Sequence, residues 1–132
     1  MPARGATGYA FNRTRTTYLA TELMLARTHW TRFRGLMATD ASRFRRGQGL
    51  WISPCHGVHT FAMRFPIDVL YLDQERIVIH IEEELKPWRM AAVRVLATSV
   101  LELPTGMIRE SKTELGDYVD ILLERPLHTE AA

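Results

Sequence analysis

The clearest hydrophobic pattern in the chain is the run Ile67–Leu72, in which Asp68 is the only polar residue. An apolar run of this length, entered through Pro66, predicts a strand that is covered on both faces. After a turn-like stretch at 73–75, apolar and polar residues alternate from Ile77 onwards. This alternation predicts a second strand with Ile77, Ile79 and Ile81 on one side, paired with the first as a hairpin.

The same reasoning predicts the remaining elements. Apolar alternation predicts further strands at residues 19–26, 50–52, 93–103 and 119–123, the third with a bulge near 97–99. Aromatic and Met residues at helical spacing predict a short helix over 29–38, and Pro104 predicts another over 105–111. These elements predict a mainly β fold, a compact antiparallel sandwich or barrel-like domain with one or two short helices. An α+β fold is the alternative.

Composition is that of one globular domain. The 132 residues are 46% hydrophobic and 24% charged, and they contain no apolar run of the roughly 18 residues that a membrane span requires. A single cysteine permits no internal disulfide, and the N-terminus has no apolar signal region. We therefore expect a cytoplasmic protein. We expect a flexible basic arm at 1–17, with at most a short strand near residues 9–11, the domain at 18–125 and a loose tail at 126–132.

Charge is unevenly distributed along the chain. Residues 1–50 hold nine Arg against two acidic residues, whereas residues 51–132 hold eight basic and thirteen acidic residues. No aromatic-interleaved basic motif of the RNA-binding kind is present, so the pattern disfavours nucleic-acid binding. The expected partner is a small anionic ligand or a protein, and the expected state is a monomer or weak dimer.

Residues 55–68 combine reactive side chains with the start of the buried strand, and they predict a polar pocket. The favoured hypothesis is a non-enzymatic binding or accessory domain that needs no cofactor and holds an anionic small molecule or peptide group. Arg offers a two-pronged fork for carboxylate or phosphate, and Trp offers an apolar wall. The candidate ligand-binding residues are His59, Thr60, Met63, Arg64, Asp68, Lys86, Trp88, Arg89 and Glu102.

Two alternatives use the same segment. The first is a metal site for Cu(I) or zinc, because nitrogen and sulfur ligands suit these ions. Its ligands would be Cys55, His56, His59 and Met63. The second is a cysteine-dependent hydrolase with Cys55 as nucleophile, His59 as base and Asp68 as the residue that orients the base.

The pairing of Asp68 separates a structural role for this segment from a functional one. A carboxylate in a buried strand requires a partner, and Arg64, His59 and Arg89 are the candidates. Its pairing is therefore expected to be either structural or part of the pocket.

Ordered sequence pieces also resemble a known family. They are RGLM from Arg34, GLWI from Gly49, HTFAMRFPIDVLYLD from His59, VLELPTG from Val100 and LGDYVDI from Leu115. In this order and spacing, over about residues 20–124, the chain resembles the bacterial and archaeal DUF192 family of unknown function. The resemblance implies a compact, mainly β sandwich-like domain. It implies no established activity, and many members of the family carry an export signal.

Overall fold

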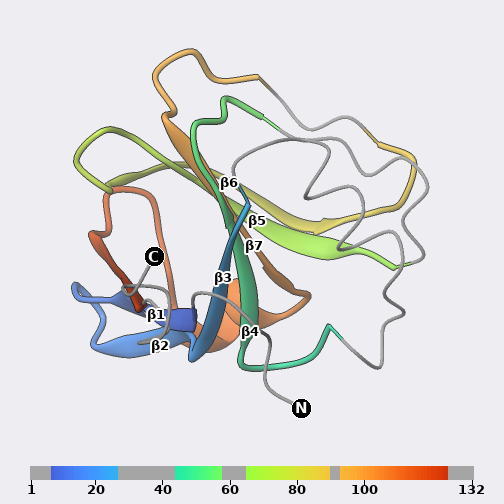
Figure 1. Ribbon diagram of the computed structural model, residues 1–132. Helices are drawn as coiled ribbons and strands as arrows, with labels where there is room; N and C mark the ends of the chain where they lie inside the picture. The colour runs from blue at the N-terminus through green and yellow to red at the C-terminus, as the bar shows by residue number, and fades with distance from the viewer. Residues whose placement is uncertain (1–6, 27–43, 58–64, 90–92, 125–132) are drawn as a thin grey trace, which may run out of the picture.

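A computed structural model describes residues 7–26, 44–57, 65–89 and 93–124. Within these ranges the chain forms eight strands and one short helix (Figure 1). The strands are β1 (Thr7–Asn12), β2 (Thr17–Ala20), β3 (Glu22–Ala26), β4 (Gln48–Ile52), β5 (Ile67–Leu72), β6 (Val78–Leu85), β7 (Ser99–Pro104) and β8 (Val119–Glu124), and the helix is α2 (Met107–Ser111). The predicted mainly β fold is confirmed. No helix in this part of the chain is long and apolar enough to cross a membrane.

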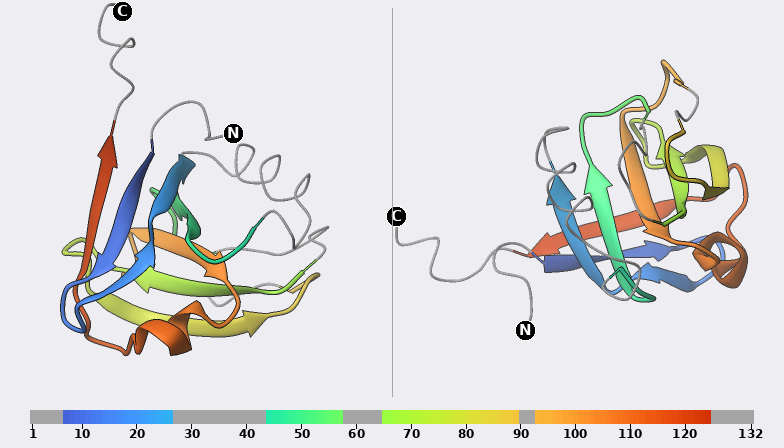
Figure 2. Two further views of the ribbon diagram at one scale, coloured as in Figure 1. Left: turned by 90° about the horizontal axis from the view of Figure 1, so that it is seen from below. Right: turned by 90° about the vertical axis from the view of Figure 1, so that its right-hand side faces the viewer.

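The strands form two sheets. A five-stranded sheet has the order β3-β4-β7-β5-β6, and a three-stranded sheet has the order β2-β1-β8. The small sheet lies across one face of the large sheet, with α2 beside it (Figure 2). All pairings are antiparallel except that of β3 with β4, which is parallel. The arrangement is therefore a sandwich of mixed strand direction, and it does not close into a barrel.

The large sheet is buried on both faces, which explains why β5 is apolar almost throughout. All six β5 side chains are buried. On one face, Val69 and Tyr71 pack with Ile52 and Val100 in one hydrophobic cluster. On the other face, Leu70 and Leu72 pack with Leu101 and Leu103, together with apolar residues of the small sheet and α2. The expectation of a doubly covered strand is confirmed.

The predicted strand over 19–26 is two strands. A bend at Thr21 separates β2 from β3, and the two belong to different sheets. The backbone N–H groups of Thr21 and Glu22 both donate to the carbonyl of Gly47, at 2.8 Å each. This shared acceptor holds the corner at which the chain passes from the small sheet to the large one.

Three other elements differ from their predictions. The arm expected over 1–17, with at most a short strand near residues 9–11, contains the six-residue β1, which is the central strand of the small sheet. The strand expected over 93–103 begins at Ser99, because residues before it form a turn. The predicted row of Ile77, Ile79 and Ile81 is broken by an irregularity in the β5–β6 pairing, and Ile79 and Ile81 pack in different clusters. The helix expected over 29–38 lies outside the described residues.

Candidate functional site

The segment predicted as the site begins with a loop that holds a second loop in place. Backbone bonds join Cys55 N–H to the Thr98 carbonyl at 2.9 Å and Arg94 N–H to the His56 carbonyl at 3.0 Å. The His56 ring adds a third contact, from Nδ1 to the Ala97 carbonyl at 2.6 Å. A carbonyl can only accept, so Nδ1 carries the proton in this contact. The 55–57 segment therefore acts as a support for residues 94–98.

Cys55 is a core residue in this arrangement. It is 5% exposed, it packs in the cluster that contains Tyr71 and Val100, and its thiol donates to the Gly57 carbonyl at 2.9 Å. Burial, reinforced by the charge of Glu82, raises the pKa of the Tyr71 hydroxyl, so this neighbour stays protonated at neutral pH. Tyr71 therefore supplies no base to activate the thiol.

A thiol-reactivity measurement tests the nucleophile hypothesis directly. We expect the native protein to react with a disulfide reagent such as dithionitrobenzoate far more slowly than the unfolded protein, because access and thiolate character control the rate. Stoichiometric reaction of the native chain at the rate of a free cysteine would contradict this expectation and favour the hydrolase alternative.

The ligands proposed for a metal are only partly visible in the structure. Cys55 and His56 are described, whereas His59 and Met63 lie outside the described residues. Over the ranges that the structure describes, no three His, Cys, Asp or Glu residues form a group suited to a metal ion. Of the two described candidates, Cys55 is buried with its thiol bonded to the Gly57 carbonyl, and His56 Nδ1 contacts the Ala97 carbonyl, so the metal site stays a prediction.

Asp68 is fully buried, and its carboxylate accepts hydrogen bonds from backbone N–H groups. Its Oδ1 accepts from Glu84 N–H at 2.9 Å, and its Oδ2 accepts from Gly106 and Ile108 N–H at 3.0 Å each. Gly106 is the N-cap of α2 at φ 92°, a conformation natural for glycine, and it has no side chain to cap the helix. Asp68 therefore caps a helix about 40 positions away in sequence.

The same carboxylate stabilises an irregularity in β6. Glu84 has φ 53°, and the pairing of β5 with β6 shifts register between Ile67 and Val69. A bulge frees a backbone N–H group from the sheet ladder, and here Asp68 accepts it. The candidate partners Arg64 and His59 lie outside the described residues, so their pairing with Asp68 stays a prediction.

Asp68 and Glu102 lie on opposite faces of the large sheet. In the β5–β7 register, Asp68 pairs with Leu103 and Val69 pairs with Glu102, so alternation directs the two acidic side chains to opposite sides. Both are fully buried. Glu102 shares its face with Cys55, whereas Asp68 faces α2. The structure therefore does not bring Asp68 together with Cys55 or Glu102, as a Cys55–His59–Asp68 relay or a single pocket would require.

The remaining predicted residues form an exposed turn at the end of β6. Lys86, Trp88 and Arg89 are all exposed, and Trp88 has φ 63° and an exposed fraction of 64%. Leu85 pairs with Ile67, so the turn lies beside the start of β5, where the predicted segment enters the strand. The predicted residues Thr60, Met63 and Arg64 lie outside the described residues.

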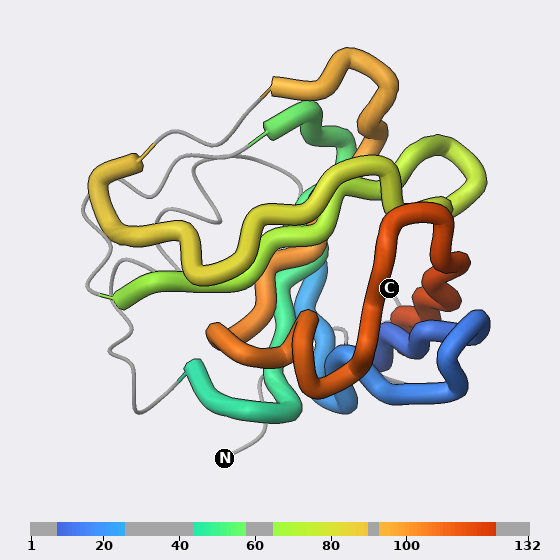
Figure 3. Tube along the Cα trace, turned by 180° about the vertical axis from the view of Figure 1, so that it is seen from behind, coloured from blue at the N-terminus to red at the C-terminus, as the bar shows by residue number. Residues whose placement is uncertain are grey.

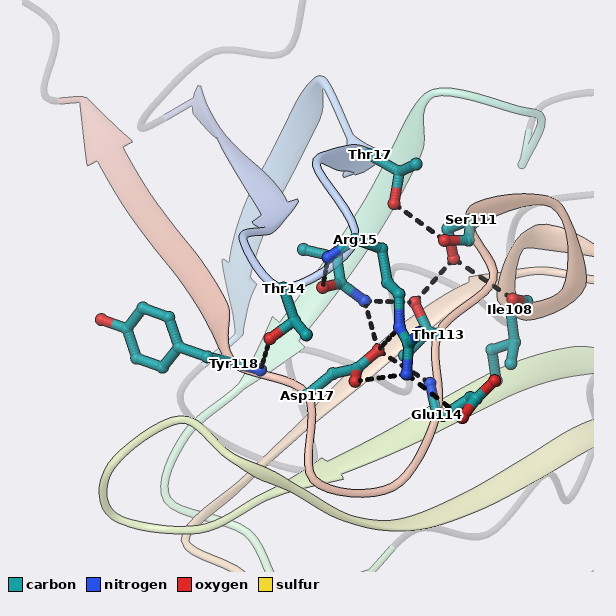
Figure 4. A network of polar contacts seen from close by, with 10 residues as sticks. Thr14, Arg15, Thr17, Ile108, Ser111, Thr113, Glu114, Asp117 and Tyr118 are labelled. Atoms are coloured by element: carbon teal, nitrogen blue, oxygen red, sulfur yellow. Dashed lines mark hydrogen bonds and ion pairs between the residues drawn. The ribbon is translucent and has the colours of Figure 1, made fainter.

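Sequence reasoning missed a buried polar network beside α2 (Figure 4). Asp117 Oδ2 accepts from Asn12 Nδ2, Arg15 Nε and Glu114 N–H at 2.9 Å each, and Asp117 Oδ1 accepts from Arg15 at 3.1 Å. Asn12 also donates to Thr113 at 2.9 Å and accepts from Arg15 N–H at 2.9 Å. These contacts tie the β1–β2 turn to the loop before β8. The one sequence signal was the LGDYVDI piece that carries the family resemblance.

A hollow of about 370 Å³ lies next to this network. Its charged lining comprises three cations, Arg15, Arg109 and Lys112, and two carboxylates, Glu83 and Glu114. Arg15 is committed to Asp117 and also contacts Glu114 at 3.1 Å. The near balance of charge and the engagement of Arg15 give this hollow no strong preference for an anion.

The chain is similar to known proteins in both sequence and fold. The family model of DUF192, described as "Uncharacterized ACR", matches residues 10–121. A UPF0127 protein of Thermococcus sibiricus is 31% identical over 114 residues, which cover 83% of this chain and 71% of that protein. A UPF0127 protein of Pyrococcus abyssi is 38% identical over 63 residues, which cover 48% of this chain and 53% of that protein. The chain thus spans only about half of the second relative.

Two solved structures share the architecture. A protein of unknown function from Novosphingobium aromaticivorans aligns with a TM-score of 0.66 and 21% identity, over 88% of this chain and 83% of that one. A proposed transcription regulator from Sinorhizobium meliloti aligns with a TM-score of 0.71 and 20% identity, over 90% of this chain and 94% of that one. At these identities the likeness shows the fold alone.

Proposed function

From the premise that this chain belongs to the DUF192 family, we propose that it is a non-enzymatic binding domain for an anionic group of a small molecule or peptide. The binding surface is the turn Lys86–Arg89 at the start of β5. The exposure of Trp88 in a left-handed backbone conformation is the observation that carries this proposal.

Trp88 is unusual in both its backbone and its exposure. A bulky residue at positive φ costs about 1–2 kcal/mol relative to the right-handed region. The residue is 64% exposed. Strained conformations of this kind concentrate at sites that bind ligands. An exposed aromatic residue with a cation on each side of it in the same turn suits the apolar part of an anionic ligand.

The two cations supply the charge. Lys86 and Arg89 are exposed at the two ends of the turn, and both residue types form charge-assisted hydrogen bonds with carboxylate or phosphate. The acidic residues that precede the turn are directed partly to other neighbours. Glu82 accepts from His80 Nε2 at 2.9 Å, and Glu83 lines the hollow beside α2. The separation of Cys55 from Asp68 by the sheet supports binding over cysteine catalysis.

The proposal predicts weak binding of small anions at this turn. Citrate and a blocked Asp-Glu dipeptide serve as probes in a titration followed by amide and indole chemical shifts. We expect shifts centred on Trp88, and we expect Lys86→Gln with Arg89→Gln to weaken binding roughly tenfold through two lost charge-assisted contacts.

The matched control removes two exposed cations, Arg109 in α2 and Lys112 directly after it, as Arg109→Gln with Lys112→Gln. It changes net charge equally, and it should leave citrate binding at the turn nearly unchanged. Equal loss in both double variants would mean that net charge alone attracts the anion. Shifts confined to the hollow beside α2 would move the site there and refute this proposal.

A further inference from the structure

The hollow beside α2 is lined by charges of both signs that the fold does not use. Its lining includes the cations Arg109 and Lys112 and the carboxylate of Glu83, all three exposed. Within the described residues, none of these side chains forms an ion pair. We propose that this hollow binds a small zwitterion, of the class of free amino acids and dipeptides. Its volume of about 370 Å³ lies near the lower end of the roughly 300–1,000 Å³ of small-molecule sites.

One buried carboxylate positions two sides of the hollow. Asp68 accepts from Glu84 N–H of β6 at 2.9 Å and from Ile108 N–H of α2 at 3.0 Å. Glu83 directly precedes Glu84, and Arg109 directly follows Ile108. The two backbone segments that carry these opposite charges are therefore bonded to the same side chain. Figure 3 shows β6 passing the segment that contains α2. The fold thus sets the spacing of these two sides before a ligand arrives, which lowers the ordering cost of binding.

The Asp117 network fixes a third side of the hollow (Figure 4). Arg15 donates to both carboxylate oxygens of Asp117, at 2.9 and 3.1 Å, and contacts Glu114 at 3.1 Å. Glu114 is thereby paired with a cation of the protein. Of the two carboxylates in the lining, Glu83 is the one that can take the ammonium group of a ligand.

The charges of the lining disfavour ions of a single sign. A simple anion attracted by Arg109 and Lys112 also meets Glu83, and a simple cation attracted by Glu83 meets those two residues. Like charges brought together in this way are unfavourable. A zwitterion can place its carboxylate on the cations and its ammonium group on Glu83, so that each charge forms charge-assisted hydrogen bonds. The inference goes beyond the proposed function, because this hollow is a different surface from the Trp88 turn and takes a ligand without net charge.

Titration of the full 132-residue chain with glycylglycine, followed by amide chemical shifts, tests the inference. Two blocked compounds serve as matched probes. N-acetylglycylglycine keeps only the carboxylate, and glycylglycinamide keeps only the ammonium group. We expect glycylglycine to cause saturable shifts at the amides of residues 108–114. Each blocked compound should bind roughly fivefold more weakly, the effect of losing one partly exposed ion pair.

Substitutions assign the two ends of the ligand. Glu83→Gln should weaken glycylglycine binding about fivefold and abolish the preference for it over the acetylated compound, because the partner of the ammonium group is gone. Arg109→Gln with Lys112→Gln should instead abolish the preference over the amide. All three side chains are exposed, so unchanged melting temperatures should verify folding.

Glu75→Gln is the matched control, since it removes one exposed carboxylate from the turn between β5 and β6. It should leave glycylglycine binding unchanged, as should Lys86→Gln with Arg89→Gln at the Trp88 turn. Equal binding of all three compounds, or a Glu83→Gln variant that still prefers the free amine, would overturn the inference. The absence of saturable shifts at residues 108–114 would also overturn it, whatever citrate does at the Trp88 turn.

Discussion

Replacing Asp68 by alanine is expected to lower the free energy of unfolding by roughly 3–5 kcal/mol, the largest effect of any single substitution considered. The change leaves the N–H groups of Glu84, Gly106 and Ile108 without their acceptor. Each buried group that loses its partner costs about 1–3 kcal/mol. Asp68→Asn should also destabilise the fold. The amide nitrogen would replace one of the two accepting oxygens and would face backbone N–H groups that are themselves donors. Thermal and urea unfolding measure both changes.

Asp73→Asn is the matched control for this experiment. Asp73 also accepts two backbone N–H groups, those of Glu75 and Ile77, but both bonds converge on Oδ1. An asparagine can retain both bonds with its single carbonyl oxygen, and the site is partly exposed, so we expect little change. If Asp68→Asn were as stable as Asp73→Asn, the carboxylate would not be the cap that holds α2 and the β6 bulge.

Replacing Asp117 by alanine is expected to be the second most damaging change, at about 2–4 kcal/mol near neutral pH. Asp117 is buried and accepts four hydrogen bonds, three of them from side-chain groups of Asn12 and Arg15. Its loss leaves one of the two N–H groups of the fully buried Asn12 amide without its acceptor, and it removes the Arg15 contacts that tie the β1–β2 turn to the loop before β8. Asp117→Asn can keep the bonds to Oδ2 and should cost less.

The same residue makes stability depend on acidity. Burial alone would raise the pKa of Asp117, but hydrogen bonds from Arg15, Asn12 and Glu114 N–H, with the Arg15 charge, lower it below its ordinary value. A carboxyl whose pKa is lower in the folded state stabilises the fold above its unfolded pKa of about 3.9. That stabilisation is lost as pH falls below about 4 and through the folded pKa. Melting curves of wild type and Asp117→Asn should therefore converge with acidification.

Asp120→Asn provides the comparison. Asp120 pairs with Arg13 from the same β1–β2 turn, but this ion pair is largely exposed. Exposed pairs contribute little to stability, so no resolvable shift in melting temperature is expected for Asp120→Asn.

For Asp117, a difference in melting temperature between wild type and Asp117→Asn that stayed constant from pH 7 to pH 3 would exclude the linkage to the Asp117 carboxyl.

The hydrophobic pattern predicted the strands whose side chains lie in the same surroundings along the whole strand. β5 could be predicted because six consecutive buried positions leave an almost continuous apolar run. β4 and β8 followed from short apolar runs bounded by turn residues. The mainly β class followed from the number of these runs. Each of these features depends on residues close together in sequence, which a local pattern records.

Features set by distant backbone were not predictable. The corner at Thr21 depends on the Gly47 carbonyl, and the bulge in β6 depends on the carboxylate of Asp68. A second irregularity, between Tyr71 and Leu72, lies opposite Ile79 and sends Ile79 and Ile81 to different clusters, although their alternation with Ile77 suggested one apolar face. A one-residue slip reverses the face of every side chain beyond it.

For the candidate site, the sequence by itself determined that Asp68 must have partners, since a buried carboxylate is costly when unpaired. It also identified the exposed aromatic and cations of the Lys86–Arg89 turn. Only the tertiary structure decided that the described partners of Asp68 are backbone groups up to 40 positions away, and that Glu102 and Cys55 lie on the opposite face. The Asn12–Asp117 network, which joins residues 105 positions apart, has the same origin. Backbone N–H groups carry no sequence identity, so only folding shows which of them a buried acid will meet.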